Sequence, residues 1–144
     1  MDLMVPFWLF FVSSIMLIGW HGDFFARAFA AFLVCMTVLT YALNIMLGMD
    51  DAWKWVILIH VAIFLVALLG AFTSSSYWPM WFAAFQFNSV AAGLAQWVDG
   101  NEYLRLYAYT ASLWAIPALC AAVIGVLRDS QLRQSQRQGD ANSL

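Results

Sequence analysis

Five long apolar runs alternate with short polar segments along the chain. The runs cover about residues 3–20, 28–47, 53–72, 77–97 and 103–127, and none has an Asp, Glu, Lys or Arg in its central part. Each run is close to the roughly 20 residues that a helix needs to cross the hydrocarbon core of a bilayer. The pattern predicts an all-α fold, a polytopic transmembrane helical bundle with five predicted spans.

Turn-forming and polar residues separate these runs. They occupy residues 21–23, 48–51, 73–76 and 98–101, where Gly, Ser, Asp and Asn are frequent. Tryptophans stand near several expected span ends, where indole rings favour the membrane–water boundary. Pro117 lies inside the last run and predicts a kink, because it cannot donate a backbone hydrogen bond. We therefore expect short hairpin connections and no separate soluble domain.

The chain divides into one membrane domain and a tail. Residues 1–127 form the expected transmembrane helical bundle. Residues 128–144 are rich in Arg, Gln and Ser and offer little apolar surface to bury, so we expect a disordered cytoplasmic tail.

Composition agrees with this division, and charge predicts the orientation. The chain is 65% hydrophobic, has a mean hydropathy of +0.80 and carries a formal net charge of -2. Arg27, Arg128, Arg133 and Arg137 fall on one side of a five-span arrangement, against Lys54 and Arg105 on the other. Basic residues favour the cytoplasmic side. We expect a bacterial inner-membrane protein with its N-terminus outside and its C-terminus in the cytoplasm.

Polar side chains inside the spans are the candidate functional residues, because each needs a partner in hydrocarbon. Folding the second and third spans about Asp50 places Thr40 opposite His60, both about 10 Å below the outer boundary. One hypothesis is that these groups form hydrogen bonds between helices. The other is that they line an outward-opening pocket for a small neutral or weakly polar ligand, with His60, Thr40, Asn44, Gln86 and Ser89 as the candidate ligand or polar-network residues.

A second set of residues indicates helix packing or a partner face. Folding the fourth and fifth spans about Gly100 places Asn88 opposite Ser112 near the middle of the bilayer. Gly93 belongs to a stripe with Gln86 and Ser89 at helical spacing, and small residues in such stripes allow close approach of helices.

Several chemistries lack support in the sequence. His21 and His60 are expected at different depths, which argues against haem ligation by both. No HExxH, GxSxG or phosphate-binding Gly-Lys motif occurs, and no metal site is expected. Cys35 and Cys120 are interpreted as structural thiols. We expect no cofactor and no enzymatic activity.

The segment YWPMWFAAFQ and the aromatic-rich stretch around Trp114 and Pro117 are similar to small multi-pass proteins of bacterial inner membranes. The resemblance covers the last two spans and implies membrane placement without an activity. We expect a non-enzymatic accessory, assembly or scaffolding subunit, with a small permease or ligand-binding membrane protein as the alternative. The expected partners are the lipid bilayer and either another membrane protein or further copies of the chain, and no nucleic acid.

Overall fold

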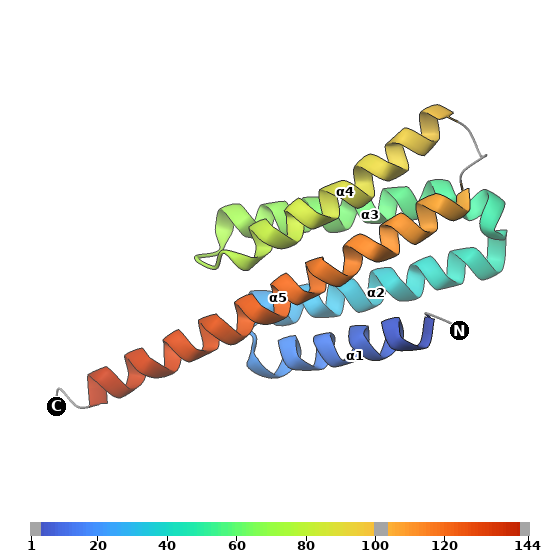
Figure 1. Ribbon diagram of the computed structural model, residues 1–144. Coiled ribbons are helices and arrows are strands. Elements are labelled where there is room, and N and C mark those ends of the chain that lie inside the picture. The colour runs from blue at the N-terminus through green and yellow to red at the C-terminus, as the bar shows by residue number, and fades with distance from the viewer. Residues whose placement is uncertain (1–3, 100–103, 142–144) are drawn as a thin grey trace.

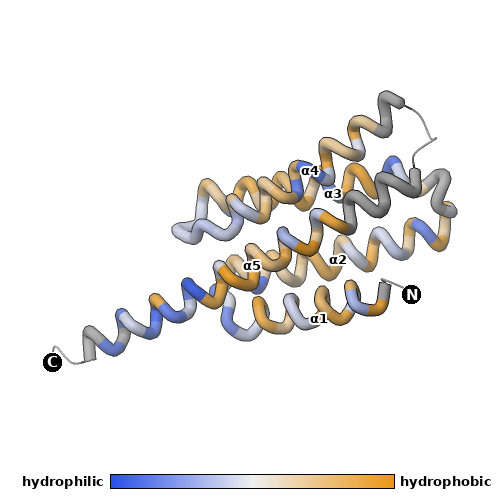
Figure 2. Tube along the Cα trace, in the orientation of Figure 1, coloured by the Kyte–Doolittle hydropathy of each residue, from blue (hydrophilic) through white to orange (hydrophobic). Residues whose placement is uncertain are grey.

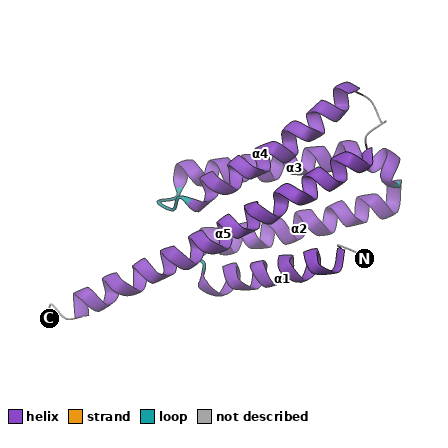
Figure 3. Ribbon diagram, in the orientation of Figure 1, coloured by secondary structure: helices purple, strands orange, loops and turns teal. Residues whose placement is uncertain are grey.

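The computed structural model describes residues 4–99 and 104–141, and these residues form five α-helices without a strand (Figure 3). The helices are α1 (Met4–His21), α2 (Phe24–Leu47), α3 (Met49–Thr73), α4 (Trp78–Asp99) and α5 (Leu104–Ala141). The predicted all-α class is therefore confirmed.

The five helices lie side by side as a bundle (Figure 1). α4 packs against both α3 and α5, α3 packs against α2, and α1 packs against α5 and, less extensively, against α2. The α1–α2 and α3–α4 turns lie at one end of the bundle, together with the projecting half of α5 (Figure 1).

Among the residues that the structure describes, three helices, rather than the five predicted, are long and apolar enough by themselves to cross a membrane. Their candidate spans are Phe24–Leu47, Ala52–Thr73 and Leu113–Gln136. The apolar stretch of α1, Val5–His21, is shorter than these spans. α4 carries Gln86, Asn88 and Ser89 near its centre, which lowers its hydropathy (Figure 2).

Local chemistry explains two of the turns. The Asp23 carboxylate accepts a hydrogen bond of 2.8 Å from the Ala26 backbone N–H and so caps the start of α2. Gly48 separates α2 from α3 with a φ of 76°, a conformation that glycine adopts without steric cost. Its N–H donates to the Asn44 carbonyl at 3.1 Å, which closes the end of α2.

Residues 128–141, which were expected to belong to a disordered tail, continue α5 as a helix through Ala141. Extending an existing helix adds a hydrogen bond per residue without a new nucleus. Arg133 also ties the start of this extension to the bundle: its guanidinium lies 3.7 Å from the Asp23 carboxylate and donates to the His21 carbonyl at 3.2 Å. Beyond this contact α5 projects past the other helices as a hydrophilic segment (Figure 2).

An aromatic cluster joins the beginnings of α2 and α4. Phe29 contacts the Phe82 ring edge-on at 5.0 Å and the Trp78 ring at 5.5 Å. Trp78 and Trp53 are buried, unlike the exposed Trp20, so the positions of tryptophans at span ends reflect the core as well as the membrane boundary. Gly125 faces Trp78 so closely that a Cβ atom there would overlap the Trp78 side chain.

Candidate functional site

The centre of the candidate site is a direct pair between α3 and α4. The Gln86 Nε2 atom lies 2.7 Å from His60 Nδ1. An amide nitrogen donates only, so Nδ1 accepts and the proton of a neutral His60 stands on Nε2. Gln86 is buried and His60 is half-buried. The sequence placed both residues in the candidate site, and the structure brings them into contact.

Ser89 extends this polar region along α4. It lies one turn after Gln86 and therefore on the same face of the helix. Its side chain is fully buried, and its hydroxyl has no hydrogen-bond partner among the described residues. A buried hydroxyl without a partner is uncommon in proteins and marks Ser89 as a position of interest.

Thr40 and Asn44 do not join the pair. The Thr40 hydroxyl donates to the Met36 carbonyl at 2.9 Å, and the Asn44 amide donates to the Thr40 carbonyl at 2.8 Å. Both groups are thus bonded within α2, as short polar side chains in helices often are. The expected Thr40–His60 bond is not among the hydrogen bonds of the described residues. Depth along the helices did not identify the partner of His60, because α3 packs against both α2 and α4. The His60 ring is bonded to Gln86 of α4.

The residues expected at a packing or partner face have different environments. Gly93 is buried within the bundle. Asn88 is half-buried and donates to the Ala84 carbonyl of its own helix at 3.2 Å. The side chain of Ser112 lies outside the described part of the chain, so its expected pairing with Asn88 is not described.

Asn88 borders a groove that the sequence did not predict. This α3–α4 groove has a volume of about 460 Å³ and opens at the surface. It is lined by Phe64, Leu68, Met80, Ala83, Ala84, Phe87 and Asn88.

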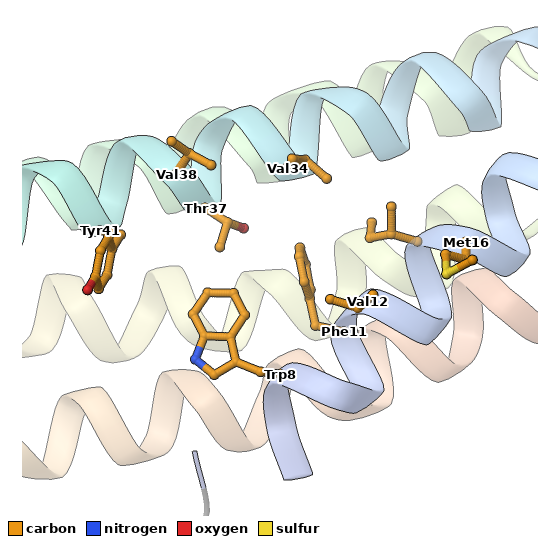
Figure 4. A pocket seen from close by; sticks show the side chains of 9 residues that line it. Trp8, Phe11, Val12, Met16, Val34, Thr37, Val38 and Tyr41 are labelled. Carbon is orange, nitrogen blue, oxygen red and sulfur yellow. The ribbon is translucent and has the colours of Figure 1, made fainter. Parts of the chain in front are cut away.

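A second groove, between α1 and α2, was also missed. This α1–α2 groove has a volume of about 560 Å³, and its lining side chains face one another across the space between the helices (Figure 4). It is lined by Trp8, Phe11, Val12, Ile15, Met16, Val34, Thr37, Val38 and Tyr41. Its one aliphatic hydroxyl, that of Thr37, already donates to the Leu33 carbonyl at 2.8 Å. No sequence signal distinguishes these positions from ordinary lipid-facing residues, because the groove arises from the separation of two helices.

The outward pocket expected from the five candidate residues stays a prediction. Neither groove is lined by His60, Gln86 or Ser89. Among the side chains that the structure describes, no group of three or more His, Cys, Asp or Glu is placed to hold a metal ion. Cys35 and Cys120 are free thiols. The site consists of a neutral pair and a buried hydroxyl inside a packed bundle.

Comparison with protein-family models, with curated proteins and with solved structures found no match to this chain.

Proposed function

We propose that this chain is a non-enzymatic, multi-pass protein of a bacterial inner membrane that acts as an accessory, assembly or scaffolding subunit of a membrane complex. One observation carries the proposal: the central polar side chains His60 and Gln86 bond to each other, while two apolar grooves open on the outside of the bundle. Grooves on the outer faces of a bundle are suited to contact other membrane proteins.

Five membrane spans are part of this proposal. Three helices meet the length and hydropathy of a span alone, and α1 and α4 lie alongside them in the bundle (Figure 1). α1 is strongly apolar, and its apolar stretch Val5–His21 falls short of the candidate spans in length alone. The polar residues of α4 are tolerable because Gln86 and Ser89 are buried against its neighbours. Arg27 and Arg133 lie at the α1–α2 turn, where Arg27 bonds to the Asp23 carbonyl through its backbone and Arg133 contacts Asp23 and His21. These basic residues support placing that end of the bundle in the cytoplasm.

The test is co-purification from native membranes in a mild detergent, followed by blue-native electrophoresis and mass spectrometry. Val38→Trp fills part of the α1–α2 groove, whereas Ile45→Trp places the same ring on an exposed position of α2 outside it. We expect a defined set of partners with the wild-type chain and with Ile45→Trp, and a reduced set with Val38→Trp. A chain that migrates alone in all three forms would contradict the proposal.

A ligand-binding membrane protein or small permease is the second candidate. The observation in its favour is the fully buried Ser89 hydroxyl without a described partner, one turn from Gln86. Such a hydroxyl could bind a small polar ligand that enters beside the His60–Gln86 pair. Ser89→Ala would then abolish the cellular phenotype without lowering membrane abundance, whereas loss of both together would leave Ser89 with a structural role.

A further inference from the structure

Asn88 presents an incompletely bonded amide at the α3–α4 groove. It lies near the middle of α4, and its one hydrogen bond among the described residues is the 3.2 Å contact to the Ala84 carbonyl. An Asn side chain carries two N–H donors and a carbonyl oxygen with two lone pairs. One N–H and the carbonyl oxygen therefore remain available at the surface of the bundle.

This placement has an energetic consequence in a membrane. Hydrocarbon offers no hydrogen bonds, so a polar group that faces lipid at mid-depth is unfavourable. Amide side chains in membrane helices accordingly favour contacts between helices. Asn88 therefore favours association of the α4 surface with another polar group at the same depth.

The groove around Asn88 suits the approach of a helix. On the α4 side, Ala83 and Ala84 have small side chains that leave room for a neighbouring helix. The Phe64 and Phe87 rings, whose centroids are 5.9 Å apart, also line the groove. Small residues permit close contact between backbones. The described lining contains no charged side chain, so a helix that covers the groove does not have to desolvate a charged group.

We propose that the α3–α4 groove binds a second copy of this chain, with the two Asn88 amides hydrogen-bonded to each other across a two-fold axis. An amide is self-complementary, because it both donates and accepts. Copies inserted with the same topology carry Asn88 at the same depth, and a two-fold interface brings identical residues together. An unrelated partner would need a matching polar group at that depth. The proposal rests on membrane insertion of α4, which belongs to the proposed function.

The first test measures dimerisation of the purified, fluorescently labelled chain in phosphatidylcholine vesicles, by energy transfer at several protein-to-lipid ratios. We expect a monomer–dimer equilibrium. Asn88→Val should raise the dissociation constant about tenfold, equivalent to about 1.4 kcal/mol, whereas Asn88→Gln should largely preserve it. The matched control is Asn44→Val, because Asn44 makes the same kind of bond to its own helix, at 2.8 Å to the Thr40 carbonyl.

The second test locates the interface by disulfide cross-linking. Ala84→Cys is introduced after Cys35→Ala and Cys120→Ala, and oxidation should give a species of twice 16.2 kDa. The control retains only Cys35, a thiol exposed on α2, and should cross-link much less. Helical content by circular dichroism establishes that each variant is folded.

Three outcomes would overturn the proposal: a monomer at every protein-to-lipid ratio, equal effects of Asn88→Val and Asn44→Val, or cross-linking through Cys35 without cross-linking of the Ala84→Cys variant. If lipid occupies the groove instead of a second copy, the chain remains a monomer at every ratio. If two copies associate through another surface, one of the other two outcomes is observed. Because the vesicles contain no other protein, failure here is separate from failure of the co-purification test.

Discussion

Replacement of Gly125 by alanine tests the packing of α5 on α4. A Cβ at residue 125 would overlap the Cβ of Trp78 and lie 2.9 Å from its Cγ and 3.3 Å from its Cα. These atoms cannot rotate away, because they are fixed to the α4 backbone or next to it. The Trp78 ring is also held by Phe25 and Phe29, at centroid distances of 5.9 Å and 5.5 Å. One helix must therefore move.

The expected magnitude follows from comparing glycines within the same chain. Overpacking a core costs about 1–3 kcal/mol, whereas Gly→Ala within a helix gains up to about 1 kcal/mol in propensity. Gly19 is the matched control, since nothing lies within 4 Å of a Cβ built there. The propensity gain is common to both substitutions, so Gly125→Ala should be less stable than Gly19→Ala by about 1–3 kcal/mol. Gly70→Ala should fall between them, because its Cβ meets the outer end of the Phe25 ring, which can tilt.

The measurement is reversible unfolding in mixed micelles, with the fraction of sodium dodecyl sulfate as denaturant and the circular dichroism of the helices as the readout. The order of stability should be Gly19→Ala, then Gly70→Ala, then Gly125→Ala. Equal stability of the Gly125→Ala and Gly19→Ala variants would refute the close contact between α4 and α5.

Three further predictions concern the polar contacts and the topology. His60→Leu removes the acceptor for the buried Gln86 amide and should cost about 1–2 kcal/mol in the same unfolding assay, whereas His60→Asn should cost less; equal losses would contradict the pair. Arg133→Gln should lower the free energy of unfolding by at most about 1 kcal/mol, because the Asp23–Arg133 pair is partly exposed. It should nevertheless accelerate amide hydrogen exchange in residues 128–136. Unchanged exchange would show that Arg133 does not anchor α5. A reporter active only in the cytoplasm should be active both after Gly22 and at the C-terminus, and opposite results at the two positions would exclude the five-span topology.

The apolar runs alone determined that the chain is helical and where most helices begin and end. Gly48 and the capping residue Asp23 marked two of the turns. These features are local, since helix periodicity, caps and breakers act within a few residues. The polar residues within the apolar runs also identified His60, Gln86 and Ser89 as candidate functional residues, although not how they are arranged.

Tertiary structure decided which polar groups meet and which faces remain open. The depth of His60 fits a partner on α2 or on α4, and only the rotation of α3 against both neighbours selects Gln86 over Thr40. Arg133 of the α5 extension contacts Asp23 at the α1–α2 turn, although the two residues are far apart in the sequence. The two grooves likewise depend on how neighbouring helices pack. A lipid-facing Val and a groove-lining Val occupy the same kind of position in the sequence pattern. Long-range contacts of this kind depend on how all five helices pack together, and hydrophobic periodicity carries no record of that packing.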